Sequence, residues 1–205
     1  MDAHDVADWR RRVFALYAAV RGAADPQTGH ALWRRGRDDL FGNHPAAPLL
    51  ADERAGFAGL SVADYDPDWR FELAMERVPP EDWDVTTGTD GRVRFERYGV
   101  VEVPDVGSLD VWRLTSYGGG LFIPVKDRTA GKPGGSYGAG RYLVDTVKGA
   151  DLGLGADSSA ARRVLVLDFN FAYNPSCAYD PTWACPLAPP GNIVGADIPV
   201  GERAG

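Results

Sequence analysis

The sequence predicts an α+β protein dominated by β-structure: two N-terminal helices followed by an antiparallel β-sandwich or β-barrel. Before residue 43, apolar residues recur at three- and four-residue steps, which is helical spacing. After residue 57, short segments of alternating apolar and polar residues are separated by turn residues, with no helical pattern long enough to connect parallel strands. We expect one domain over 1–205, with a mainly helical segment at 1–43 and a β-rich body at 57–205 that ends in a C-terminal motif loop.

The first helix is predicted from apolar residues that share one face: Val6, Trp9, Val13, Leu16 and Val20. Asp5 is the expected N-cap, because a carboxylate accepts the free N–H groups of a first turn. The stretch Asp25 to Gly29 is predicted to be a loop. A second helix is then expected from about His30 to Leu40, ending at the Gly42-Asn43 turn signal.

About eight short strands are predicted after the helices. Residues Trp69 to Met75 alternate between apolar and charged side chains, which is typical of a half-buried strand. Asp84 to Thr87 and Arg92 to Tyr98 flank Gly88 to Gly91, a good hairpin turn. The remaining predicted strands are Val100 to Val103, Leu109 to Leu114, Leu121 to Val125, Arg141 to Val144 and Val164 to Leu167.

Composition limits the partners that we expect. The net charge of −7 argues against a nucleic-acid partner, because such proteins normally present a basic face. No apolar run approaches the length that spans a bilayer. The pair Arg11-Arg12 is preceded by the acidic stretch Asp2 to Asp8 and followed by a short apolar one, so it does not fit an export signal. The sequence therefore predicts an acidic, cytoplasmic protein without a membrane partner.

The strongest candidate site is a set of polar side chains near one strand end and one glycine-rich turn: Tyr137, Arg141, Asp168, Asn170, Tyr173 and Asn174. Arg141 begins a predicted strand and Asp168 ends one. Adjacent antiparallel strands place the start of one beside the end of the other. We therefore expect the loop after Asp168 to fold over the turn Gly134 to Gly140, with Asp168 and Tyr173 near Arg141.

Two functional hypotheses from different classes follow. The first is a small-molecule enzyme, a hydrolase or lyase without an organic cofactor or metal, in which Asp168 or His44 acts as base. Arg141 would hold an anionic group of the substrate, and Tyr137 and Tyr173 would orient it. The second is a non-catalytic β-barrel module that binds a small ligand or another protein, because no recognised catalytic constellation is present. An Asp–Arg pair and a loop histidine can also be purely structural.

The two cysteines, Cys177 and Cys185, leave three alternatives open. Zinc sites commonly use two to four residues between paired cysteines, and here there are seven. A metal site would need His44 and Asp168 to converge on a thiolate. A disulfide is the second alternative. We predict the third: free, poorly reactive thiols, because no neighbour in sequence supplies a cation that would lower a thiol pKa. The Gly134-to-Gly138 match to a nucleophile elbow is weak, since no helix follows it.

The chain resembles an uncharacterised bacterial and archaeal family, catalogued as domain of unknown function 1684. One motif reads Ser-Tyr-Gly-Ala-Gly-Arg at 136–141, where the family usually reads Thr-Tyr-Gly-Gly-Gly-Arg. A second covers 168–192, with Asp-Phe-Asn, Ala-Tyr-Asn-Pro, Cys-Ala-Tyr, Cys-Pro-Leu and Pro-Pro in order. Further matches are Phe122-Ile123-Pro124 with Asp127, Gly201-Glu202, and weaker echoes at Arg37-Asp38, Leu40-Phe41, His44-Pro45 and Pro48-Leu49. The resemblance implies membership and no particular activity.

Overall fold

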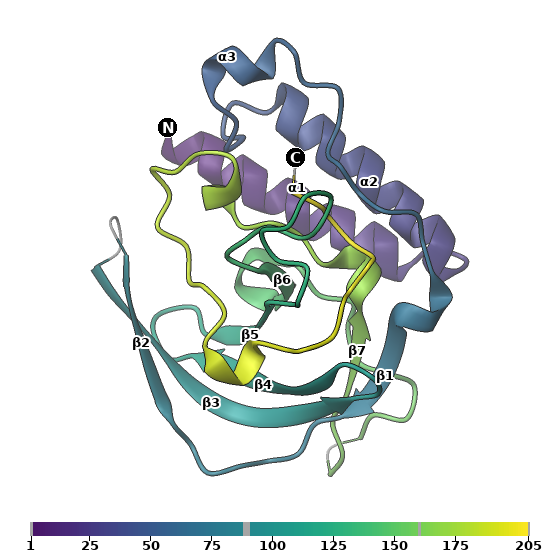
Figure 1. The fold of residues 1–205 in the computed structure, drawn as a ribbon. Helices are drawn as coiled ribbons and strands as arrows, with labels where there is room; N and C mark the ends of the chain where they lie inside the picture. The colour runs from purple at the N-terminus through teal and green to yellow at the C-terminus, as the bar shows by residue number, and fades with distance from the viewer. Residues whose placement is uncertain (1, 88–90, 160, 205) are drawn as a thin grey trace.

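Two long helices form the N-terminal part of the structure, as the sequence predicts (Figure 1). The structure is a computed structural model and describes residues 2–87, 91–159 and 161–204. Helix α1 spans Ala3–Arg21, α2 spans Pro26–Asn43, and a short α3 spans Ala51–Arg54. Helix α1 begins before the expected cap: the side chain of Asp2, not Asp5, accepts the N–H of His4 at 2.7 Å.

The start of α2 corrects the sequence prediction. The residues from Asp25 to Gly29 do not form a loop, because Asp25 is the N-cap of the helix and accepts the N–H of Thr28 at 2.7 Å. Pro26 takes the first helical position, where its fixed φ suits the helix and its missing N–H costs nothing. Gly29 faces α1, and a side chain there would meet the backbone oxygen of Val20 at 3.2 Å. The missing side chain lets the helices approach closely.

The strands form two open antiparallel sheets, which confirms the β-dominated α+β class, and neither sheet closes into a barrel. One sheet is a five-stranded meander in the order β2-β3-β4-β5-β6, and the other is the two-stranded ribbon β1-β7. The described strands are β1 (Arg70–Ala74), β2 (Asp82–Thr87), β3 (Gly91–Val103), β4 (Gly107–Leu114), β5 (Gly120–Val125), β6 (Arg141–Asp145) and β7 (Val164–Asp168).

Strand β3 unites two segments that the sequence analysis separates, Arg92 to Tyr98 and Val100 to Val103. A bulge between Arg97 and Gly99 lies at their junction. There the chain after β1 crosses closely, because the backbones of Glu76 and Val100 exchange two hydrogen bonds of 2.9 Å. This crossing joins the two sheets. The expected hairpin turn after β2 includes residues 88–90, which lie outside the described residues.

The main core lies between the sheets and includes Val101, Leu109, Val111, Ile123, Val125, Leu167, Phe169 and Ile198. The last residue in this list belongs to the C-terminal segment, residues 191–203, which crosses the molecule from the sheet towards the helices (Figure 1). Its backbone exchanges hydrogen bonds with Lys126 through Asn192 and Val194, both of 2.9 Å. Near its end, Gly201 accepts the N–H of Ala63 at 3.0 Å.

A second cluster joins the helices to the sheets. Trp33 of α2 is fully buried against Tyr17 of α1 and Phe171, and its indole N–H donates to the Tyr17 hydroxyl at 3.0 Å. Burial raises the pKa of Tyr17 to about 12. Because a buried indole N–H needs an acceptor, the bond sets the orientation of this large side chain.

We predict that Gly99→Ala lowers the free energy of unfolding by roughly 1–3 kcal/mol, the usual cost of overpacking. The new Cβ would lie 2.6 Å from the backbone oxygen of Glu76 and 2.7 Å from Met75. Urea unfolding measures the change. Gly195→Ala is the matched control, since a Cβ at this exposed position meets nothing within 4 Å. Equal effects of the two substitutions would contradict the close crossing.

Candidate functional site

The structure does not pair Asp168 with Arg141, so the expected juxtaposition is wrong. The premise of adjacent strands fails, because β6 ends the five-stranded sheet whereas β7 pairs with β1. The carboxylate that Arg141 contacts is that of Asp127, with Nη2 and Oδ2 separated by 2.8 Å and both side chains fully buried. One part of the expectation holds: Tyr173 lies beside this strand, since its backbone exchanges hydrogen bonds of 2.8 and 3.0 Å with Tyr142.

Arg141 holds the C-terminal segment. Its Nη2 donates to the backbone oxygen of Ile198 at 3.2 Å and its Nη1 to that of Glu202 at 3.2 Å. Nη1 also donates to the backbone oxygen of Val200. Burial lowers the pKa of the guanidinium, and the charge of Asp127 acts against this shift. The side chain is 0 % exposed and both of its terminal nitrogens bond to protein acceptors, so it acts as a structural clamp that solvent does not reach.

Asp127 keeps its charge although it is buried. Burial alone would raise its pKa, but hydrogen bonds from Thr129 and the charge of Arg141 outweigh this effect and hold the pKa below its usual value. The Thr129 N–H donates to Oδ1 at 2.7 Å, and its hydroxyl also contacts this oxygen. Ser136 belongs to the same network through Thr129 and is fully buried, so the elbow-like motif forms a structural turn.

Asp168 and Asn170 form a second enclosed network. Oδ1 of Asp168 accepts two hydrogen bonds from Asn170, from the backbone N–H at 3.1 Å and from Nδ2 at 2.7 Å. Its other oxygen accepts from Tyr65 at 3.3 Å and Arg70 at 3.4 Å. The amide of Asn170 is bound on both sides to the backbone of Asp66, at 2.8 Å each. Burial raises the pKa of Asp168, but the carboxylate is 1 % exposed and cannot reach a substrate.

Asn174 and Tyr173 belong to a third network, centred on Glu202. The carboxylate of Glu202 accepts the Asn174 backbone N–H at 3.2 Å and Arg37 Nη2 at 2.6 Å. The Arg37 guanidinium carbon lies 5.0 Å from the centre of the Tyr173 ring and 5.1 Å from that of Trp33. Burial raises the pKa of Glu202, against the opposing charge of Arg37. This ion pair joins α2 to the end of the chain.

His44 is also a structural residue. It is 3 % exposed, and its Nδ1 accepts the N–H of Ala46 at 3.0 Å. Its Nε2 is therefore the protonated nitrogen and donates to Asp8 at 3.1 Å. The ring packs edge-on against Trp9. With both nitrogens engaged, His44 ties the end of α2 to α1 and has no free nitrogen to act as base.

Tyr137 contacts the loop that carries the cysteines. Its hydroxyl donates to the backbone oxygen of Cys177 at 3.2 Å and lies 3.9 Å from the sulfur. Cys177 and Cys185 are half-buried thiols that hydrogen-bond to each other. This bond lowers the pKa of Cys185 and raises that of Cys177, and the nearby charge of Lys148 also lowers that of Cys185. The two cysteines form no disulfide, as predicted. The sequence argument considered only neighbours in sequence and so missed Lys148, which lies near Cys185 in space.

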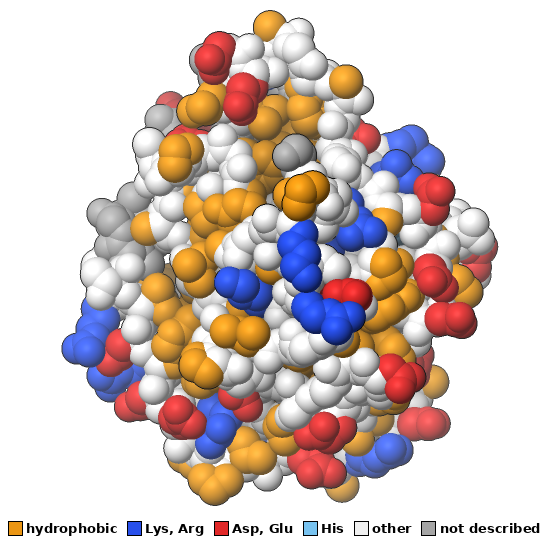
Figure 2. Space-filling view, viewed as in Figure 1, with side chains coloured by type: hydrophobic (Ala, Val, Ile, Leu, Met, Phe, Trp, Pro, Cys, Tyr) orange, Lys and Arg blue, Asp and Glu red, His pale blue; other side chains and the backbone are white. Residues whose placement is uncertain are grey.

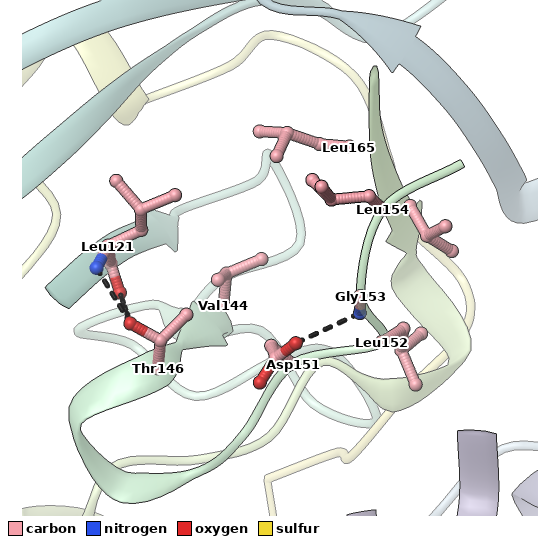
Figure 3. Close-up of a pocket in the computed structure, with 9 residues that line it drawn as sticks. Leu121, Val144, Thr146, Asp151, Leu152, Gly153, Leu154 and Leu165 are labelled. Carbon is pink, nitrogen blue, oxygen red and sulfur yellow. Dashed lines mark hydrogen bonds between the residues drawn. The ribbon is translucent and has the colours of Figure 1, made fainter. Parts of the chain in front are cut away.

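Two hollows among the described residues differ in chemistry. A cavity of about 120 Å³ lies between β5, β6, β7 and the loop 151–154, and its walls are mainly aliphatic (Figure 3). A polar hollow of about 430 Å³ lies between the end of α2 and the residues after α3. It is lined by Asp38, Asp39, Gly42, Asn43, Arg54, Phe57, Ala58 and Gly59. Within the described residues, no group of three or more His, Cys, Asp or Glu side chains could hold a metal ion.

Sequence reasoning missed the residues that complete the polar networks. Asp127, Glu202 and Arg37 were noted only as parts of the family resemblance. Nothing in their local pattern indicates burial, because the contacts that bury them are distant in sequence. Arg37 and Glu202, for example, form an ion pair although 165 positions separate them in the chain. The available signal was the resemblance itself, whose motifs contain all three residues.

The fold and its networks define a class: two helices packed against two open antiparallel sheets, with a C-terminal segment held by buried polar side chains. The chain belongs to the family described as "Protein of unknown function (DUF1684)", which it matches over residues 55–203. It is similar to the solution NMR structure of an uncharacterised protein from gene locus rrnAC0354 of Haloarcula marismortui. The two are 32% identical with a TM-score of 0.59, over 83% of this chain and 89% of that one. No curated protein matches.

We predict that Asp127→Asn lowers the free energy of unfolding at pH 7 by roughly 3–5 kcal/mol, because it leaves a buried guanidinium without its counter-charge. A carboxylate with a lowered folded-state pKa stabilises the protein above its unfolded pKa, about 3.9. This contribution is lost as the pH falls through the folded-state pKa. The difference between the two proteins should therefore shrink below about pH 4.

Asp197→Asn provides the control, measured by the same urea unfolding. Asp197 pairs with Arg128 at 2.7 Å, but both side chains are largely exposed, so the loss should be much smaller. Equal losses of stability for the two substitutions would contradict the role of the buried pair. So would a stability difference between wild type and Asp127→Asn that stays the same at every pH.

Proposed function

We propose that this protein is a non-catalytic binding module that takes a small apolar ligand into the cavity between its two sheets. The cavity itself is the observation that carries the proposal. Its volume of about 120 Å³ approaches that of apolar protein cavities, about 150 Å³, that hold benzene or xenon. A ligand that fits would be a small hydrocarbon or the apolar end of a larger molecule.

The walls of the cavity support an apolar occupant. Figure 3 shows aliphatic side chains of Leu121, Val144, Leu154 and Leu165 around the hollow. The two polar side chains are already engaged. The Thr146 hydroxyl accepts the N–H of Leu121 at 2.7 Å, and Asp151 accepts the N–H of Gly153 at 2.9 Å. A ligand therefore meets mainly hydrocarbon, and burial of its surface supplies the favourable free energy.

The hydrolase or lyase hypothesis has lost the observation that motivated it. It needs Asp168 or His44 to be free to act as base, and Arg141 to be free to hold an anion. Each of the three side chains is almost fully buried and bound to other protein groups. A catalytic base must reach the proton that it abstracts. The binding hypothesis needs none of these groups.

The proposal includes a cytoplasmic location and no nucleic-acid partner. The net charge of −7 supports the second point. On the face drawn in Figure 2, acidic and basic side chains are interspersed with hydrophobic ones. Among the described residues, no helix has the length and apolar character that crossing a membrane would require.

We predict that xenon binds in the cavity. Methyl NMR signals of Leu121, Val144 and Leu165 should shift in a saturable way as the xenon pressure rises, while distant methyl groups change little. An organic extract of the purified protein, analysed by mass spectrometry, would identify a ligand retained from the cell. If xenon causes no saturable shift in the lining methyl groups, the proposed site does not exist.

Leu154→Trp tests the location of the site. Leu154 lines the cavity and is 53% exposed, so an indole can cover the opening without disturbing the core. We expect xenon binding to weaken at least about tenfold, with little change in the unfolding midpoint. Leu187→Trp is the matched control, because Leu187 is similarly exposed, at 48%, and does not line the cavity. An equal loss of binding in both variants would contradict the assignment.

A further inference from the structure

The two cysteines meet although seven residues separate them in sequence. Cys177 lies in the single turn Ser176–Ala178, and Cys185 lies in the irregular segment that follows. Both residues pack against the segment 137–142, Cys177 beside Tyr137 and Cys185 in the aromatic cluster that contains Tyr142, and the two thiols interact with each other. The same segment brings two phenols to the pair. The Tyr137 hydroxyl lies 3.9 Å from the Cys177 sulfur, and that of Tyr142 interacts with Cys185.

The surroundings of the two sulfur atoms shift their pKa values in opposite directions. Cys185 receives a hydrogen bond from Cys177. It packs against the aromatic cluster that contains Tyr142, whose hydroxyl donates to the Pro186 oxygen at 2.8 Å. Lys148 adds positive charge, with its ammonium group 5.6 Å from the centre of the Tyr142 ring. Its charge is partly balanced by Asp145 at 3.5 Å. The hydrogen bond from Cys177 and the charge of Lys148 favour a thiolate at Cys185, whereas Cys177 keeps its proton and donates it.

The pair is also accessible. Both cysteines are only half-buried, and the backbone from residue 183 to 189 belongs to no helix or strand. A thiolate in contact with solvent can meet a small oxidant. A segment without ladder hydrogen bonds can shift enough to bring two contacting sulfur atoms to bonding distance. A redox-active dithiol requires two neighbouring sulfur atoms, one of them with a lowered pKa, and access for the oxidant.

We propose that Cys177 and Cys185 form a reversible oxidation site for hydroperoxides, with Cys185 as the attacking thiolate and Cys177 as the resolving thiol. The Cys185 sulfur attacks one oxygen of the peroxide. An S–O bond forms, the O–O bond breaks, and the leaving oxygen takes a proton from water. The peroxide is reduced to an alcohol, or to water for hydrogen peroxide, and Cys185 is oxidised to a sulfenic acid.

The second step closes the disulfide. The Cys177 sulfur attacks that of Cys185, the S–S bond forms, and the S–O bond breaks. The hydroxyl group leaves as water with the proton of Cys177. A low-molecular-weight dithiol reverses the reaction by thiol–disulfide exchange and returns both protons and two electrons. The site is separate from the apolar cavity, which neither cysteine lines.

Hydrogen peroxide and intact-mass spectrometry test the proposal on the reduced protein. We expect a monomer that has lost the mass of two hydrogen atoms, resists alkylation, and regains both thiols with dithiothreitol. In Cys177→Ser, the sulfenic acid at Cys185 should persist and be trapped by dimedone. In Cys185→Ser, oxidation should be at least about tenfold slower, because Cys177 holds its proton. Dimedone mapping on early wild-type samples provides the same assignment without a variant.

Lys148→Gln tests the source of the activation. We expect it to slow oxidation of Cys185 several-fold, whereas Lys132→Gln, at an exposed lysine in another loop, should leave the rate unchanged. Three outcomes would overturn the proposal: dimedone on Cys177 before Cys185, disulfides only between chains, or equal oxidation rates for the two Cys→Ser variants.

Discussion

The rest of the structure depends on the buried guanidinium of Arg141. The C-terminal segment crosses the interior in an irregular conformation, and three of its carbonyl groups accept hydrogen bonds from this one side chain. Arg141 donates to the backbone oxygens of Ile198, Val200 and Glu202. The planar fork of an arginine can serve several acceptors at once, which a lysine cannot do in the same geometry. Asp127 supplies the counter-charge that makes this burial tolerable.

The other polar networks extend the same principle. Asn170 binds the turn before β1 through both atoms of its amide, and Glu202 joins the chain end to Arg37 of α2. Each network links segments that are more than a hundred residues apart. The buried charged and amide side chains thus stabilise the fold. Features suited to meet other molecules lie elsewhere, in the aliphatic cavity beside the loop 151–154 and in the cysteine pair.

The sequence predicts elements well where a local pattern decides them. The alternation at Trp69 to Met75 and the helical spacing from Val6 to Val20 both identify elements of the right type. It fails where tertiary contacts decide. The bulge at Gly99 depends on a crossing strand, and the partner of Arg141 depends on which sheet each strand joins. The prediction of a loop from Asp25 to Gly29 was wrong because an aspartate followed by proline can also begin a helix.

The central claim is that buried polar side chains make the segment 191–203 an integral part of the core. Native-state hydrogen exchange tests it most directly. The N–H of Glu202 donates to the Ala172 oxygen at 2.8 Å, and that of Ala63 to Gly201 at 3.0 Å. We expect both amides to exchange only through global unfolding, with the same opening free energy as the amides of β4. Exchange of the Glu202 amide by local fraying, with an opening free energy far below that of β4, would contradict the account.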